Sequence, residues 1–318
     1  MPELAGTVAD AFEAQVREHE ERWLSPLAVR SYETRGRLRE EDDCRLRTPF
    51  QRDRDRILHS KPFRRLKGKT QVFIDPAGDH YRTRMTHTLE TTAIARGVAR
   101  ALRLNEDLVE AIGLGHDIGH PPFGHAGEDA LDQALQEHFG RRFRHNEHSL
   151  KIAESLNLTA EVRDGILTHT GEREPSTLEG KIIRIVDRVA YINHDIDDAV
   201  GFGILDPADL PQDEVALLGD RGSKRIDTLV HDLVESSKAA GDIVQSEEIG
   251  GAMLALRAFM FERVYLGPHP QLEQERARTA IRRIFDERAA RGDEPEQIVD
   301  FIAGMTDRFA LTYVAELG

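Results

Sequence analysis

Apolar residues recur at helical spacing along most of the chain. Between residues 89 and 104 they stand three or four positions apart, with charged residues between them, as in an amphipathic α-helix. A second helix is expected at 108–114, where Asn105 is a suitable N-cap and Gly115, Gly119 and two prolines mark the end. Similar segments cover 126–138, 147–156, 161–169, 181–199, 223–240, 246–265, 271–290 and 294–317. The pattern predicts an all-α fold with a helical C-terminal part.

One stretch breaks the helical pattern. Residues 70–74 are rich in β-branched and aromatic side chains, residues 75–79 contain Pro and Gly, and a second extended stretch follows at 80–83. We expect one short β-hairpin here. Loops bearing Pro and Gly are expected at 170–180 and 201–222, and the second is long enough for a lid or an oligomer contact.

The composition indicates a soluble globular protein. The chain has 318 residues, of which 39% are hydrophobic, enough to bury one large core or two modest ones. No apolar run approaches the ~20 residues that span a bilayer, and the N-terminus lacks the basic and then apolar pattern of a secretory signal. We therefore expect a cytoplasmic protein without membrane association.

Charge is unevenly distributed along the chain. The net charge is −14, but residues 45–69 hold ten Lys and Arg against Asp53 and Asp55, a net of +8, so the rest carries −22. A solvated helix face that pairs with acidic residues is one interpretation. An anion site for the phosphates of a nucleotide or of a nucleic-acid strand is the other. The sequence favours neither.

The densest chemical signal lies at residues 114–128. Three imidazoles (His116, His120, His125) and two carboxylates (Asp117, Glu128) surround a helix break made of Gly and Pro. Such a run is a costly way to build a core and a natural way to build a hydrolytic site. The dipeptide His-Asp alone is weak because it also occurs at 194–195 and 231–232.

A metal site needs further ligands from other segments. His87 begins the helix before the His116-Asp117 helix, and Asp187 lies in an apolar helix where a carboxylate is costly unless paired or bound to metal. Taken singly, His87 could be a structural histidine and Asp187 could pair with Arg184 or Arg188. Seven of the 14 histidines, however, lie between residues 87 and 148. That clustering favours a site for a divalent ion.

The order His87, His116-Asp117, Asp187 resembles the HD superfamily of metal-dependent phosphohydrolases. The strings FRRLKGKTQVF (63–73), RMTH (84–87), GHDIGHPPFGH (115–125) and HNE (145–147) are similar to its deoxynucleoside triphosphate triphosphohydrolase branch, the dGTPase-like proteins. The likeness covers about residues 54–198. It implies an HD-type helical bundle, and we expect an N-terminal charged helical arm at 1–60, a catalytic core at 61–200 and a helical C-terminal region at 201–318.

The resemblance also assigns roles to residues. Those that match the metal ligands are His87, His116, Asp117 and Asp187. The catalytic pair is matched by His125 and Glu128, a phosphate-contacting histidine by His120, and a further active-site histidine by His145. Those that resemble contacts to the triphosphate are Arg84, Arg188 and Tyr191, while Asp195 and Gln71 resemble contacts to the sugar 3′-hydroxyl.

The implied activity is hydrolysis of dGTP or several dNTPs at the α-phosphorus with a divalent ion: Mn, Mg or Fe, with Ni and Zn as further candidates. The family likeness also implies a homo-oligomer and a nucleotide activator. Two alternatives stay open. One is another HD phosphohydrolase, acting on a monophosphate, a cyclic dinucleotide or an alarmone. The other is a sensor that binds nucleotide or single-stranded nucleic acid through residues 45–69.

Overall fold

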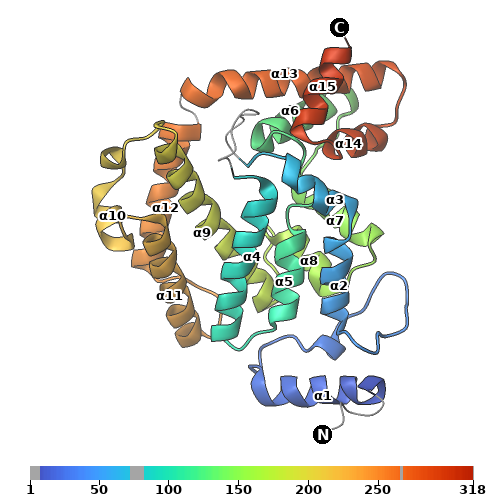
Figure 1. Cartoon of the computed structure of the whole chain (residues 1–318), viewed down its shortest axis with the longest axis vertical. Coiled ribbons are helices and arrows are strands. Elements are labelled where there is room, and N and C mark those ends of the chain that lie inside the picture. Colours follow the sequence, from blue (N-terminus) through green and yellow to red (C-terminus); the bar gives the residue numbers. More distant parts are fainter. Residues whose placement is uncertain (1–7, 72–81, 266–267, 318) are drawn as a thin grey trace, which may run out of the picture.

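Three helices form the centre of the molecule, and the other helices pack around them. In a computed structural model, which describes residues 8–71, 82–265 and 268–317, helices α4 (Arg84–Ala101), α5 (Glu106–Gly115) and α9 (Leu178–Gly201) pack against one another. Figure 1 shows them between α11 and α12 on one side and α2 and α8 on the other. The predicted all-α fold is confirmed.

Most of the remaining helices after residue 123 match predicted segments, whereas the helix at 212–218 lies in a predicted loop and the three helices before residue 66 had no individual prediction. The remaining helices are α1 (Val8–Trp23), α2 (Pro49–Leu58), α3 (Lys61–Arg65), α6 (Gly124–Phe139), α7 (His145–Ser155), α8 (Ala160–Thr168), α10 (Gln212–Leu218), α11 (Gly222–Ala240), α12 (Glu247–Met260), α13 (Pro268–Ala290), α14 (Pro295–Ala303) and α15 (Asp307–Glu316). Short 3₁₀ turns occur at η1 (Ser31–Glu33), η2 (Leu66–Gly68) and η3 (Pro207–Asp209), and a π-helical turn, η4 (Phe261–Tyr265), follows α12. Asn105 caps α5 as predicted, because its side chain accepts a hydrogen bond from the Leu108 backbone N–H.

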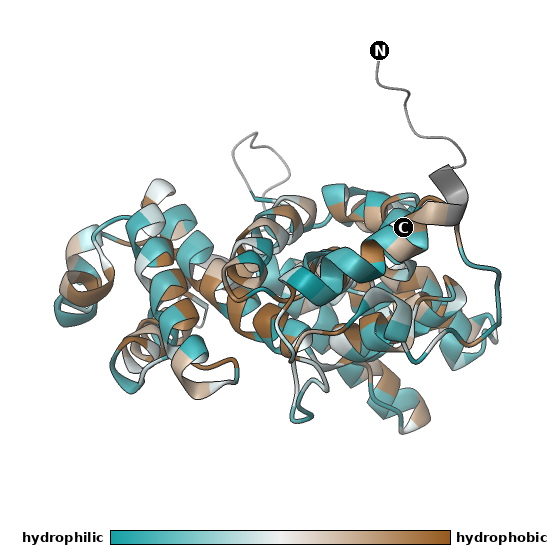
Figure 2. Ribbon diagram, turned by 90° about the horizontal axis from the view of Figure 1, so that it is seen from below, coloured by the Kyte–Doolittle hydropathy of each residue, from teal (hydrophilic) through white to brown (hydrophobic). Residues whose placement is uncertain are grey.

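Buried apolar side chains form three clusters. The first lies between α2, α4, α5, α8 and the first half of α9, and includes Ile57, Val98 and Ile112. The second joins α6 to α13, α14 and α15, and the third joins the second half of α9 to α10, α11, α12 and η4. Figure 2 shows hydrophilic and hydrophobic residues alternating along most of the helices, as expected for amphipathic helices. The C-terminal helices thus form two groups: α10, α11 and α12 pack beside α9, and α13, α14 and α15 pack on α6.

Three expectations from the sequence need comment. The segment 201–222 is not an open loop, because it contains η3 and α10, and the buried Leu218 joins the third cluster. The single segment 294–317 divides into α14 and α15 at Gly304. The predicted hairpin falls mainly on residues 72–81, which lie outside the described residues; its flanks form one isolated antiparallel bridge, Thr70 to Thr83. Among the described residues, no helix is both long and apolar enough to cross a membrane.

Candidate active site

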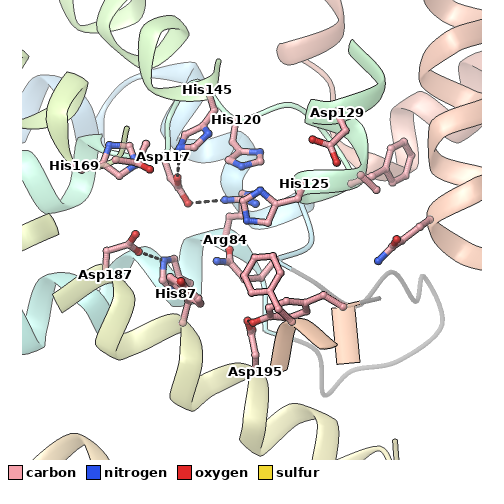
Figure 3. Close-up of a pocket in the computed structure, with 18 of the residues that line it drawn as sticks. Arg84, His87, Asp117, His120, His125, Asp129, His145, His169, Asp187 and Asp195 are labelled. Atoms are coloured by element: carbon pink, nitrogen blue, oxygen red, sulfur yellow. Dashed lines mark hydrogen bonds and ion pairs between the residues drawn. The ribbon is translucent and has the colours of Figure 1, made fainter. Parts of the chain in front are cut away.

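Ten of the 13 predicted site residues line one cavity of about 430 Å³ beside the central helices; His116, Glu128 and Arg188 are not part of the described lining. Its walls come from α4, the turn between α5 and α6, the start of α7, α9, η4 and α13. Figure 3 shows His87, Asp117 and Asp187 on one side, His120, His125 and His145 on another, and Asp195 beyond Arg84. Residues more than 200 positions apart in the sequence, such as Gln71 and Arg278, therefore share one pocket.

The four predicted metal ligands lie together. Ligand atoms of His87, His116 and Asp117 all lie within 4.8 Å of one another. Asp187 joins them, because its Oδ1 is 2.9 Å from His87 Nε2 and 3.7 Å from His116 Nε2. His116 Nε2 is also 3.7 Å from Asp117 Oδ2. The helix ends of α4 and α5 and the middle of α9 position these groups.

The tautomer of His116 suits a metal ligand. Its Nδ1 lies 2.7 Å from the Gly113 carbonyl oxygen, which can only accept, so Nδ1 carries the hydrogen. The lone pair is then on Nε2, which is buried and has no hydrogen-bond partner among the described residues. A metal-ligating imidazole characteristically donates its other N–H to a carbonyl or carboxylate in this way. The His₂Asp₂ donor set therefore fits a divalent ion.

Arg84 is buried beside this cluster with spare donors. Its Nη1 donates to Asp117 Oδ2 at 2.6 Å, while its Nε and Nη2 are buried without a partner among the described residues. Burial alone would raise the pKa of Asp117, but Arg84 and His116 hold that pKa well below its usual range. A buried guanidinium with unsatisfied N–H groups beside a pocket is suited to an anion such as phosphate.

The histidines of the turn differ in environment. His120 is buried, so the pKa of its imidazole lies well below the usual range, and its ring stacks on His145 with centroids 4.5 Å apart. Glu128 holds His145 by accepting from its backbone N–H at 2.8 Å and from Nδ1 at 2.9 Å. His125 is 73% exposed at the edge of the pocket, and its Nδ1 is 3.6 Å from Glu128 Oε2. Glu128 thus contacts His145 more closely than His125.

His145 has the geometry of an imidazolium. His169 donates its Nδ1–H to the Ile166 carbonyl, so its Nε2 carries a lone pair and must accept from His145 Nε2, 3.2 Å away. Because Nδ1 of His145 faces Glu128, both ring nitrogens of His145 are donors. Burial opposes this charge, but Glu128 and Asp117 together raise the pKa of His145. The site therefore holds a positive charge at His145 as well as at Arg84.

The predicted substrate contacts are only partly at the pocket. Gln71, Arg84, Tyr191 and Asp195 line it, whereas Arg188 is not part of its described lining. Tyr191 accepts from Arg257 Nε at 2.7 Å, and Tyr265 donates a short hydrogen bond to Asp195. Burial raises the pKa of Asp195 to about 7, and the Tyr265 hydroxyl moderates this rise.

Several pocket residues were not predicted from the sequence. They are Phe123, Asp129, His169, Thr170, Arg257, Phe261, Tyr265, Gln274 and Arg278. His169 carried a usable signal, since it ends a predicted helix as His116 does. Two members of the histidine cluster lie elsewhere: His138 pairs with Asp286, and His148 contacts Gly119 and Asp300.

Comparisons with known proteins agree with this geometry. The HD domain family matches residues 84–192. A deoxyguanosinetriphosphate triphosphohydrolase-like protein of Caldanaerobacter subterraneus subsp. tengcongensis is 51% identical over 94% of this chain and 94% of its own length. Proteins of the same description from Desulfatibacillum aliphaticivorans and Clostridium perfringens strain 13 are each 43% identical, over 96% and 90% of this chain and 96% and 91% of their own.

A solved structure supports the fold. A hypothetical protein from Aquifex aeolicus aligns with a TM-score of 0.53 at 20% identity, over 82% of this chain and 67% of its own. At that identity the likeness concerns the fold alone. The sequence relatives, which match nearly the whole chain, show more: the chain belongs to the HD-domain family of deoxyguanosinetriphosphate triphosphohydrolase-like proteins.

Proposed function

We propose that this protein hydrolyses deoxynucleoside triphosphates at the α-phosphorus, releasing the deoxynucleoside and inorganic triphosphate. Membership of the family supports a phosphohydrolase. The observation that carries the finer proposal is the position of Arg84, whose unpartnered buried N–H groups lie beside the His87, His116, Asp117 and Asp187 cluster. Donors for a polyphosphate and ligands for a divalent ion thus meet in one pocket.

The metal ligands in this proposal are His87, His116, Asp117 and Asp187. Their nitrogen and oxygen donors suit Mn²⁺, Mg²⁺ or Fe²⁺, and Ni²⁺ or Zn²⁺ are further candidates. A bound divalent ion would polarise a phosphoryl oxygen and make water a better nucleophile near neutral pH.

The chain's own residues supply the remaining chemistry. Arg84 and the His145 imidazolium would neutralise charge that builds up on the phosphates. Water forms a bond to the α-phosphorus while the bond to the sugar 5′-oxygen breaks, and that oxygen needs a proton. His125, exposed at the pocket and 3.6 Å from Glu128, would move that proton, and His120 would contact a phosphate.

The sugar and the distal phosphates would meet the remaining polar groups. Asp195 and Gln71 are proposed to contact the 3′-hydroxyl, and Tyr191 and Arg188 the triphosphate. Arg188 has no ion pair among the described residues and needs a side-chain movement to join the pocket lining. Arg257, which bonds Tyr191 directly, is a second candidate for a phosphate contact.

The test is product analysis with defined metals. Purified protein, stripped of metal and then supplied with Mn²⁺ or Mg²⁺, is incubated with each dNTP, with and without a second nucleotide as activator. We expect a deoxynucleoside and triphosphate in equal amounts. Release of pyrophosphate or monophosphate, or hydrolysis of a cyclic dinucleotide or an alarmone in preference to every dNTP, would contradict the proposal and favour another HD phosphohydrolase.

A nucleic-acid surface is a second candidate function, supported by unpaired cations. Of the basic residues between 45 and 69, Arg47, Arg52, Arg54 and Arg56 form ion pairs and Lys69 is buried. Exposed side chains on α3 and η2 have no acidic partner among the described residues: Lys61, Arg64, Arg65 and Lys67. These four residues would bind the phosphates of a single strand.

Salt-dependent binding tests this surface. Replacing Arg64, Arg65 and Lys67 with Ala should weaken binding of a single-stranded oligonucleotide and reduce the salt slope by about one per lost phosphate contact. The matched control replaces Arg47 and Arg52, which are ion-paired. Equal affinity of both variants would contradict the proposal that this surface binds nucleic acid.

Light scattering with and without dNTP tests two further proposals, the homo-oligomer and the nucleotide activator.

A further inference from the structure

The C-terminal helix α15 reaches the active-site turn, which we define as residues 116–123. Asp307, the first residue of α15, accepts from the Phe123 backbone N–H at 2.9 Å with Oδ1. Its Oδ2 accepts from the Thr70 backbone N–H at 2.9 Å and from the Thr70 hydroxyl at 2.8 Å. One carboxylate therefore joins three segments that are far apart in the sequence.

Lys69 forms a second link between the same segments. Its side chain is 1% exposed, and its Nζ donates to the His120 carbonyl at 2.6 Å and to the Ala303 carbonyl at 2.7 Å. A buried ammonium group is costly unless it is hydrogen-bonded. The backbone carbonyl of Lys69 also accepts a hydrogen bond from the Arg84 backbone N–H at 3.0 Å. Lys69 thus connects the active-site turn, the end of α14 and the start of α4.

The turn itself has a conformation that needs support. Phe123 is buried in the left-handed region, with φ 64° and ψ 26°. A non-glycine residue there costs on the order of 1–3 kcal/mol and persists only where its surroundings hold it. The hydrogen bond to Asp307 and the packing of the Phe123 ring in the second cluster supply that support. His125 and Glu128 follow Phe123 directly on α6.

Close backbone approaches leave these segments little room to shift. A Cβ on Gly68 would lie 2.8 Å from Thr306 Cγ2, and one on Gly124 would lie 2.4 Å from the Gln71 carbonyl oxygen. Gly124 also has φ +57°. Residues 68–71 are therefore tightly packed between the N-terminus of α15 and the N-terminus of α6. Figure 1 shows α15 and α14 next to α3 and α6 at this end of the molecule.

We propose that Asp307 is a positioning residue for the reaction: with Lys69, it fixes the active-site turn against residues 69–71 and so sets the places of His120, His125 and Gln71. It contacts neither the substrate nor the metal ligands and acts through the backbone at Phe123 and Thr70. The C-terminal helices are then part of the catalytic apparatus, although the metal ligands all precede residue 188.

The test is amide hydrogen exchange on the full chain carrying Asp307→Asn. The substitution keeps the size of the side chain but turns one oxygen acceptor into an N–H₂ donor, which faces a backbone N–H. We expect exchange in residues 118–128 to become at least about tenfold faster, with little change in α7 or α9. The matched control is Asp286→Asn, which removes a carboxylate of α13 that pairs with Arg282; it should leave residues 118–128 unchanged.

A milder variant guards against loss of folding. Thr70→Val removes the hydroxyl bond to Asp307 and keeps the backbone bond, so a smaller acceleration of about threefold is expected in the same residues. Unchanged exchange in residues 118–128 for both variants, or a uniform rise over every helix, would overturn the proposal.

Activity gives a second measurement, which rests on the proposed function. Asp307→Asn should lower kcat for dNTP hydrolysis about tenfold or more, because His125 acts in the transition state. KM should change less than kcat, since Gln71 contacts only the sugar, and bound Mn²⁺ should stay within about twofold. An increase in KM alone, or loss of Mn²⁺, would contradict positioning. If the wild type hydrolyses no dNTP, the proposed function fails, while the exchange result still decides the role of Asp307.

Discussion

The two walls of the pocket are built in different ways. One wall, here called the metal wall because it carries the four proposed metal ligands, comes from α4, α5 and α9. Its side chains are tightly spaced, buried except for the half-buried Asp187, and fixed by partners such as the Gly113 carbonyl. The opposite wall, formed by Arg257, Phe261, Tyr265, Gln274 and Arg278 of α12, η4 and α13, is more open. Phe261 is 43% exposed there, with the Arg257 guanidinium 4.8 Å from its ring centroid.

This difference separates chemistry from recognition. A divalent ion needs ligand atoms held within a few tenths of an ångström, and buried helix positions provide that precision. Longer side chains at the partly open edge of the pocket can instead contact the sugar, base or distal phosphates of a ligand. We therefore expect substitutions on the metal wall to stop the reaction and substitutions on the opposite wall to change affinity.

The largest effect is expected from Asp117→Asn. It removes the charge of one proposed metal ligand and the carboxylate partner of Arg84. Because a metal ion contributes several kcal/mol to the transition state, kcat should fall by about 10³-fold or more, and bound Mn²⁺ should be lost. The matched control is Asp232→Asn, in the His-Asp dipeptide of α11 away from the pocket. Retained metal and activity in the Asp117 variant would remove the distinction between the walls.

The next effect concerns proton transfer at the edge of the pocket. His125→Ala should lower kcat roughly 10²- to 10⁴-fold, the range for loss of a general acid or base, and leave bound metal unchanged. His138→Ala serves as the control, since His138 also lies on α6 but pairs with Asp286. If His125→Ala is nearly as active as the wild type, the His145 imidazolium becomes the better candidate for the proton donor.

A smaller effect is expected on the opposite wall. Arg257→Gln removes the hydrogen bond to Tyr191 and the cation beside Phe261. KM for the dNTP should rise about tenfold, the loss of one hydrogen bond to a charged group, while kcat changes less than about threefold. Steady-state kinetics on this variant provide the measurement. The control is Arg276→Gln, which replaces an exposed arginine of α13. A fall in kcat with unchanged KM would show that Arg257 acts in the transition state instead.

The same contrast decides what the sequence could predict. Asp117 and His116 stand in a dense motif and Asp187 stands out as a carboxylate in an apolar helix, so local patterns were sufficient to find them. No such local sequence pattern distinguishes Arg257 or Tyr265. They reach the pocket because Val189, Ile192 and Met253 pack α12 and η4 onto α9, and that packing depends on tertiary contacts. Asp307 lies still farther from any motif, and only its buried partners reveal it.

Partner choice was also beyond the sequence. Glu128 lies within 4 Å of three histidines, His120, His125 and His145, and the family resemblance suggested His125 as its partner. The structure brings the start of α7 to Glu128, so His145 makes the shorter contacts. For residues 201–222, the prolines and glycines indicated a loop, but Leu205, Leu210 and Leu218 are buried in the third cluster and fold the segment around α10.

The last expected effect concerns stability and not activity: the free energy of unfolding should change with pH because of Asp195, which lies between the two walls. Its folded pKa is raised to about 7 by burial, above the ordinary value of 3.8. The folded state therefore binds the proton more tightly than the unfolded chain, so the wild type loses stability as pH rises from 4 to 7 and no further above that range.

The Asp195→Asn variant has no carboxyl group at this position and does not lose stability in this way. Its free energy of unfolding relative to the wild type should rise by on the order of 1–4 kcal/mol between pH 4 and pH 7 and then stay level. Urea unfolding of metal-free protein at each pH measures the difference, with Asp197→Asn on the exposed side of α9 as the control. A difference that does not vary with pH would mean that Asp195 is ionised in the folded protein, and Tyr265 would then donate to a carboxylate that belongs to the charged metal wall.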